Sequence, residues 1–253
     1  MIKQLNRVHP LSRGLRASYS LNEFSGRYAN NAVGYVGGTL TNDCYFTPRG
    51  VSFDGTTDYI TGSFNGFDNA VQCSVSADVI FNTFAPSFQV IVSKWNGAIA
   101  EMKWHLFCDN LGRVYFQISD SSGANSTYIY SNFAMTVGIK YTITATWSGN
   151  ANRMEMFFNG LKDTATTLNA GSAITIILPT ASTEFRISTA QYNSTANNYS
   201  VNGFISNVNL YNRTLTGNEA MQLAINPNVM FATSNISSLY KARNQNNFFR
   251  MFN

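Results

Sequence analysis

The stretch QCSVSADVIF, residues 72–81, alternates apolar and polar side chains almost throughout. Its apolar members share one face: Cys73, Val75, Ala77, Val79 and Phe81. A period of two residues is typical of a β-strand that buries one face. The stretch IKYTITATW, residues 139–147, repeats the pattern with threonines on its polar face. These two segments predict long, half-buried strands and favour an all-β fold.

Shorter stretches of the same kind recur between turn signals such as Asn159-Gly160. The further expected strands are 15–21, 51–54, 58–62, 88–95, 103–108, 112–118, 126–131, 153–159, 184–188 and 203–211. About a dozen short strands separated by turns predict a sandwich or a barrel. One helix is expected after them, because Thr216 and Glu219 have the spacing of a capping box and Pro227 ends the run that follows.

Composition fits one large domain with a substantial core. The chain has 253 residues, of which 44% are hydrophobic and only 12% are charged, whereas average soluble domains have roughly 25% charged residues. Seven of the 17 basic residues lie in residues 1–20 and 232–253, where no acid occurs. The body between these flanks is therefore slightly acidic and has no basic stripe, which argues against direct nucleic-acid binding.

The cysteines and the N-terminus indicate folding in a reducing compartment. Cys44, Cys73 and Cys108 are odd in number and lack metal-ligand spacing, so we expect buried, unreactive thiols. The N-terminal residues have no apolar stretch of signal-peptide length, and no window approaches a membrane span. We therefore expect synthesis in a cytoplasm and no membrane insertion.

Four motifs in order resemble one family. They are HPLSRGLRASYSLNEFSG from residue 9, VSFDGTTDYI from residue 51, MFFNG from residue 156 and GFISNVNLYNR from residue 203. Together they resemble a laminin-G-like, concanavalin-A-like domain, as found in bacteriophage structural proteins. The resemblance implies an all-β, two-sheet antiparallel jelly-roll β-sandwich with one short C-terminal helix. We expect an N-terminal arm over residues 1–14, the sandwich over 15–231 and a basic, aromatic tail over 232–253.

The residues do not favour catalysis. Hydrolases on this type of sandwich are expected, by resemblance, to carry clustered carboxylates on one strand. None of the five glutamates has a second carboxylate two residues away, and Glu219 is assigned to the helix cap. His105 lies in a strand-like segment, WHLF, where a lone histidine is usually structural or exposed. We expect no catalytic residues, although a divergent glycan hydrolase or lyase stays an alternative.

Two ligand classes are considered for the sandwich. By resemblance, Asp54 and Asp58 are candidates for calcium, against a role as turn formers that bind local amides. A glycan site would use aromatic residues beside polar loops. The candidates are Trp95, Tyr128, Tyr130, Tyr192 and Tyr199, and the competing interpretation is that they are ordinary core and strand residues. We expect no other cofactor.

The flanks suggest burial against another protein. The C-terminal segment is rich in aromatic residues, unlike typical disordered tails. Its expected docking residues are Arg243, Phe248, Phe249, Arg250 and Phe252. By resemblance, we expect a virion structural protein, as capsid decoration or on the tail or fibre surface, that contacts other virion proteins and host or environmental glycans. A homotrimer is one arrangement open to it, and a soluble lectin-like carbohydrate-binding module is the alternative function.

Overall fold

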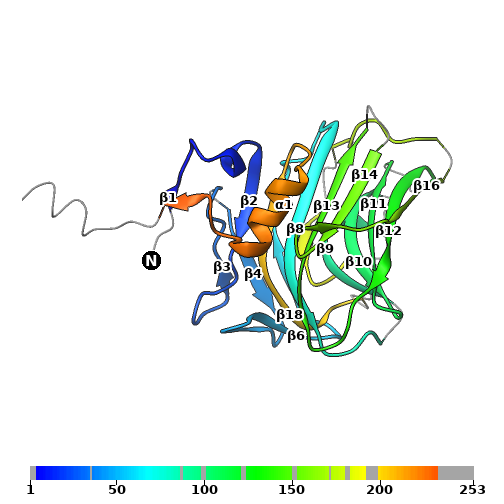
Figure 1. Ribbon diagram of the computed structural model, residues 1–253. Helices are drawn as coiled ribbons and strands as arrows, with labels where there is room; N and C mark the ends of the chain where they lie inside the picture. Colours follow the sequence, from blue (N-terminus) through cyan, green and yellow to red (C-terminus); the bar gives the residue numbers. More distant parts are fainter. Residues whose placement is uncertain are drawn as a thin grey trace, which may run out of the picture.

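The chain folds into two antiparallel sheets packed face to face, as the computed structural model shows (Figure 1). The described residues are 4–34, 36–85, 88–97, 101–120, 124–149, 153–170, 172–179, 183–191 and 199–232. Their architecture confirms the predicted two-sheet β-sandwich with a short helix near its C-terminal end. No helix in these ranges has the length and apolar character that crossing a membrane requires.

The first sheet has nine strands among the described residues. Their spatial order is β16 (Thr166–Ala170), β12 (Ser126–Ala134), β11 (Arg113–Ser119), β10 (Glu101–Asp109), β9 (Phe88–Asn96), β17 (Phe185–Ile187), β7 (Tyr59–Gly62), β4 (Gly38–Thr41) and β3 (Tyr28–Ala29).

The second sheet has eight strands in the same ranges. Seven follow the order β15 (Leu161–Lys162), β14 (Arg153–Phe158), β13 (Lys140–Ser148), β8 (Gln72–Phe81), β18 (Asn202–Tyr211), β6 (Gly50–Asp54) and β5 (Tyr45–Thr47), and β2 (Leu15–Tyr19) also pairs with β18. The two long strands expected from alternation, β8 and β13, lie side by side at its centre. Their register places Trp147 opposite Cys73, and both side chains are fully buried.

Helix α1 (Gly217–Ile225) begins and ends as the sequence predicts. The Thr216 hydroxyl accepts a hydrogen bond from the Glu219 amide, and the Glu219 carboxylate accepts one from the Thr216 amide. Ala220 and Leu223 are fully buried, whereas Ile225 is exposed. The helix packs against β13 and β15, and thereby covers part of the second sheet (Figure 1).

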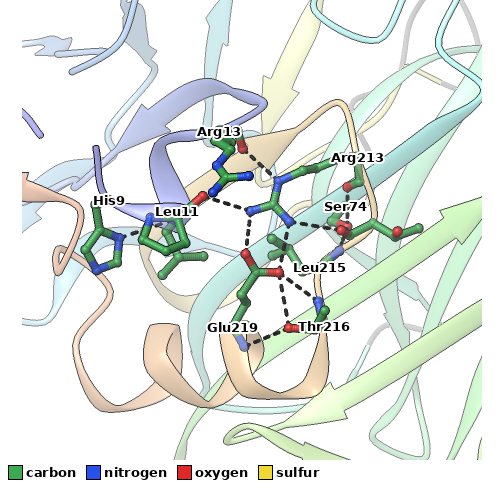
Figure 2. Close-up of polar contacts among 10 residues, drawn as sticks. His9, Leu11, Arg13, Ser74, Arg213, Leu215, Thr216 and Glu219 are labelled. Atoms are coloured by element: carbon green, nitrogen blue, oxygen red, sulfur yellow. Dashed lines mark hydrogen bonds and ion pairs between the residues drawn. The ribbon is translucent and has the colours of Figure 1, made fainter. Parts of the chain in front are cut away.

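The two flanks meet at one end of the molecule. Strand β1 (Gln4–Leu5) pairs with β19 (Phe231–Ala232), so that Gln4 lies opposite Ala232. A 3-10 turn, η1 (Pro10–Ser12), follows β1 and buries Leu11 completely against a small cluster with Leu223. Arg213 donates hydrogen bonds to the backbone carbonyls of Pro10 and Arg13 (Figure 2). Residues 4–14 are thus held against the end of β18 and the start of α1.

Candidate functional site

The candidate site lies on the outer face of the first sheet. Strand alternation directs Trp104, Leu106, Phe116 and Ile118 into the core, where all four are fully buried. The intervening residues of β10, β11 and β12 must therefore face outward. The register aligns them in two rows across the strands: His105, Gln117 and Tyr128 in one, and Phe107, Tyr115 and Tyr130 in the other.

The outward aromatic rings stack on one another. Trp95 and His105 lie 4.1 Å apart between centroids with ring planes 7° apart. Phe107 stacks on Tyr115 at 4.9 Å, and Tyr115 stacks on Tyr130 at 5.6 Å. Because the planes are nearly parallel and the residues stand on adjacent strands, the rings turn their faces to each other and their edges away from the sheet. Only the ring at the end of such a stack has an uncovered face on which a ligand could pack.

One half of this face is covered by the chain itself. The Ser93 hydroxyl donates a 2.7 Å hydrogen bond to the Thr189 carbonyl, and Ala190 is completely buried in a cluster with Trp95 and Phe107. Trp95 is consequently only 6% exposed, and its ring stacks on His105. Its predicted role as a sugar platform is wrong, because the segment after β17 folds over it. The competing interpretation of Trp95 as a buried residue is confirmed.

The other half is called here the tyrosine surface and consists of Asp109, Arg113, Tyr115, Tyr128, Tyr130 and Leu168; Asp109 is buried and the other five are at least partly exposed. The three tyrosines are half-buried, and Leu168, beside Tyr128 on β16, is 40% exposed. Two of the predicted glycan residues, Tyr128 and Tyr130, therefore lie together in this surface. Tyr199 is half-buried on the same outer face near Phe88, and Tyr192 lies outside the described residues.

An ion pair borders the tyrosine surface. Arg113 reaches Asp109 at 2.7 Å, and the Tyr115 hydroxyl donates to the same carboxylate oxygen at 3.2 Å. The guanidinium also lies 5.9 Å from the ring centroids of both Tyr115 and Tyr130. Burial, and then the negative charge of Asp109, raise the pKa of Tyr115, so its hydroxyl stays protonated at neutral pH. This cluster has no net charge and presents hydrogen-bonding groups beside aromatic carbon.

His105 is part of the buried half and not a proton carrier for the open half. Burial lowers the pKa of His105 to about 4, so its ring is neutral at neutral pH. Its Nε2 lies 3.0 Å from Gln117 Oε1, and since that oxygen only accepts, Nε2 carries the proton. The histidine therefore holds Gln117 in position beneath the tyrosines.

The predicted calcium residues are used as turn formers instead. Asp54 accepts hydrogen bonds from the Thr56 and Thr57 amides and the Thr56 hydroxyl. Asp58 accepts from the amides of Asp43 and Asp54. Each of the four carboxylate oxygens thus accepts a local hydrogen bond, as the turn-former interpretation expects. Two carboxylates supply fewer ligands than the about 6–8 oxygens that calcium needs, and the described residues contain no group of three or more His, Cys, Asp or Glu side chains placed to hold a metal.

Comparison with known families identifies the fold family. A laminin-G-type model of the concanavalin A-like lectin/glucanases superfamily matches residues 54–221, more than half of the chain. The chain belongs to this superfamily. The matched part of the superfamily domain runs from the hairpin that contains Asp58 to the middle of α1, and so includes the whole tyrosine surface.

Solved structures agree on the fold. A sialidase of Trypanosoma rangeli, in complex with 2,3-difluoro-KDN, is similar with a TM-score of 0.60 and 15% identity over 91% of this chain and 37% of that one. The receptor-binding domain of botulinum neurotoxin mosaic serotype C/D is similar with a TM-score of 0.62 and 13% identity, over 84% of this chain and 50% of that one. The chain thus spans half or less of these structures, and no curated protein matches it.

Sequence analysis missed four residues of the surface: Asp109, Arg113, Tyr115 and Leu168. The signal was present in RVYFQIS, residues 113–119, where alternation alone places Arg113, Tyr115 and Gln117 on one face. The predicted docking residues cannot be placed, because Arg243, Phe248, Phe249, Arg250 and Phe252 lie outside the described ranges.

Proposed function

We propose that this chain is a non-enzymatic surface protein of a bacteriophage virion that binds a glycan on its tyrosine surface. The observation that carries the proposal is the pair Tyr128 and Tyr130, half-exposed on one strand beside Arg113. Aromatic rings pack against the apolar faces of flat partners, and polar groups at the margin fix their orientation. The tyrosine surface offers both within one small area.

The free ring faces lie at the β16 side of the surface. Tyr130 stacks on Tyr115 and is the last ring of that pile among the described residues. The Tyr128 ring makes no ring contact with any residue in the described ranges, and its neighbour across the strands is the exposed Leu168. A sugar ring placed here would stack on Tyr128 or Tyr130 and reach the polar groups of Arg113 and Gln117.

Charge favours a neutral glycan. Arg113 is already neutralised by Asp109, so an acidic sugar would have to compete with a close carboxylate. The same pairing supports binding without catalysis. Glycoside hydrolysis uses two carboxylates that flank the bond, and Asp109 is the only acid among the residues that define the surface. Its carboxylate also accepts hydrogen bonds from the amides of Leu111 and Arg113, the Arg113 side chain and the Tyr115 hydroxyl.

The virion setting draws on the motif resemblance and on the paired flanks. Pairing of β1 with β19 brings Gln4 beside Ala232, from which the segment with Arg243, Phe248 and Phe252 continues. Two acid-free, basic flanks thus start from the same end of the sandwich, and a partner with acidic residues around an apolar pocket would complement them.

A glycan array with the intact chain tests the binding part. We expect wild-type to bind a neutral glycan, and Tyr128→Ala and Tyr130→Ala each to weaken binding about fivefold or more, since stacking contributes about 1 kcal/mol or more per ring. Tyr45→Ala is the matched control, because Tyr45 is 60% exposed on the second sheet. Unchanged binding in both surface variants, or no binding by wild-type, would remove the glycan proposal.

Co-sedimentation with phage particles tests the virion part. The full chain is compared with a form that lacks residues 233–253 and keeps β19. We expect only the full chain to associate with particles, with both forms equally folded by circular dichroism. Equal association, or none by the full chain, would favour the soluble lectin-like module. Saccharide cleavage that disappears on replacing a single carboxylate would instead establish a hydrolase or lyase.

A further inference from the structure

A cavity lies at one edge of the sandwich, distinct from the tyrosine surface. Its volume is about 250 Å³. Its walls come from Phe133, Tyr141, Phe158, Asn159, Leu161, Lys162 and Asp163. Phe133 belongs to the first sheet, whereas Tyr141 and Phe158 belong to the second. The cavity is therefore formed where the two sheets part.

Alternation explains why three aromatic rings meet there. Each of the three aromatic residues lies an even number of positions from a buried residue of its own strand, and so on the same face of that strand. These pairs are Phe133 with Ile129, Tyr141 with Ile143, and Phe158 with Met156. All three rings therefore point between the sheets. At this edge the sheets leave Phe133 40% exposed and Leu161, on the edge strand β15, 67% exposed, whereas Tyr141 and Phe158 are 8% and 7% exposed. Solvent therefore reaches this apolar wall mainly at Phe133 and Leu161.

The rings are mutually inclined and do not form a pile. Phe133 and Tyr141 lie 5.6 Å apart at 63°, Tyr141 and Phe158 lie 6.4 Å apart at 89°, and Phe133 and Phe158 lie 4.9 Å apart at 51°. Inclined rings make an angled wall, and the negative faces of such rings attract cations. Proteins use walls of this kind to hold alkylammonium groups, which need both apolar contact and negative potential.

A carboxylate that lines the cavity adds a negative charge, which also favours a cationic ligand. Asp163 accepts a 2.9 Å hydrogen bond from the Asn132 amide and forms no ion pair with any described residue. Lys162 does not neutralise it, because the Lys162 ammonium binds Glu155 at 2.9 Å. Lys162 pairs with Phe157 in register, so its side chain follows the outer face of the second sheet. The uncompensated charge beside the rings is therefore negative.

We propose that this cavity binds a small organic cation with a quaternary ammonium head. The three rings surround the methyl groups on one side, and Asp163 supplies the counter-charge. The polar Asn159 at the rim is placed for a hydroxyl or similar group on the remainder of the ligand. Neither the tyrosine surface nor the flanks take part, so the site stands independently of the proposed glycan function.

Choline and its neutral carbon isostere 3,3-dimethylbutan-1-ol are the probes, because they share a shape and differ in charge. Binding to the intact chain is measured by calorimetry and by NMR line broadening of the probe. We expect choline to bind at least tenfold more tightly than the isostere. Equal affinities would show a general apolar pocket and would overturn the proposal, as would the absence of choline binding.

Variants assign the binding to this cavity. We expect Asp163→Asn and Phe133→Leu each to weaken choline binding about tenfold, since the first removes the charge and the second the ring at similar apolar volume. Phe133→Leu leaves an apolar residue in place, so folding is preserved. Phe24→Ala is the control, because Phe24 is 96% exposed and does not line the cavity. Choline affinity that survives both cavity variants would refute the assignment.

Discussion

Arg213 and Glu219 form a bidentate ion pair, with nitrogen–oxygen distances of 2.6 and 2.9 Å (Figure 2). The same guanidinium binds the carbonyls of Pro10 and Arg13, which lie about 200 residues earlier in the chain. Glu219 in turn completes the capping box of α1. One arginine thus connects the N-terminal segment, the end of β18 and the helix that follows, and it stabilises the end of the sandwich where both flanks start.

Replacing Arg213 should loosen this end of the molecule. We expect Arg213→Ala to lower the free energy of unfolding by about 2 kcal/mol, because the half-buried Glu219 and two carbonyls lose their charged donor. Arg213→Lys should recover little of it, since an ammonium cannot reproduce the planar fork. Denaturant unfolding gives the free energy, and hydrogen exchange at residues 11–14 should accelerate.

The control for Arg213 is Arg49→Ala. The Arg49 guanidinium lies over the Phe204 ring at 5.4 Å, and within the described ranges no carboxylate pairs with it. A loss of under about 1 kcal/mol is expected there. If the two alanine variants unfold at the same denaturant concentration, Arg213 does not hold the flanks.

Lys103 should destabilise the native protein. Its side chain is completely buried, and its ammonium has no hydrogen-bond partner among the described residues. We expect Lys103→Met to raise the free energy of unfolding by about 1–3 kcal/mol at pH 7, because an unsatisfied buried polar group is removed. Lys94→Met is the contrasting variant. Lys94 binds Asn65 and Asp68, so its replacement leaves the Asp68 carboxylate without its ion-pair partner. Lys94→Met should therefore lower the free energy of unfolding.

The pH dependence of Lys103 has a defined sign. Burial lowers the pKa of Lys103 below its ordinary value of 10.5, so the folded state disfavours the charged form. Between the lowered pKa and 10.5, the unfolded chain binds more protons than the folded chain, and stability rises with pH. Unfolding free energies from pH 7 to 10 should show this rise in wild-type and a flatter profile in Lys103→Met. Identical profiles would contradict the assignment.

His105 should make the protein acid-sensitive. Its folded pKa of about 4 lies below the ordinary value of 6.5, so its contribution to stability is complete above pH 6.5 and is lost as the pH falls to about 4. The full loss is about 3 kcal/mol. We expect His105→Gln to be less stable than wild-type at pH 7 but to have a weaker pH dependence between 6.5 and 4.

The three cysteines should be unreactive in the folded state. All are free and buried. Burial is the main cause that raises the pKa of Cys44 to about 11, and it also raises the pKa of Cys73 and Cys108. An aromatic disulfide reagent at pH 8 should label no thiol in the native protein and all three after unfolding. Rapid labelling of any one in the native state would show that its cover opens readily.

Local patterns predicted the long strands and the helix of this fold, but they missed the short strands β1, β3, β4, β5, β15, β16 and β19. The alternation in residues 72–81 and 139–147 predicted β8 and β13, and both form with the expected buried faces. The spacing of Thr216 and Glu219 predicted the start of α1, and the capping box is present. These features depend on residues that are close in sequence, where the period of side-chain direction is fixed by backbone geometry alone.

The candidate sites depended on pairing between distant strands. Alternation indicates that Tyr128 and Tyr130 share a face, but only the register between β11 and β12 brings Tyr115 and Arg113 beside them. Trp95 looks like an exposed platform in sequence, yet the segment around Ala190 covers it. The cavity edged by Phe133 and Phe158 likewise exists only because two strands of different sheets end together.

The amino-acid sequence by itself thus determined that the chain is an antiparallel sandwich with one capped helix and three buried cysteines. Only the tertiary structure decided which aromatic side chains remain exposed and that Asp54 and Asp58 accept hydrogen bonds from nearby turn amides. It also decided that Asp163 lacks a counter-ion within the described residues. The physical reason is that direction and burial of a side chain follow from local periodicity, whereas its neighbours across a sheet follow from register and loop placement.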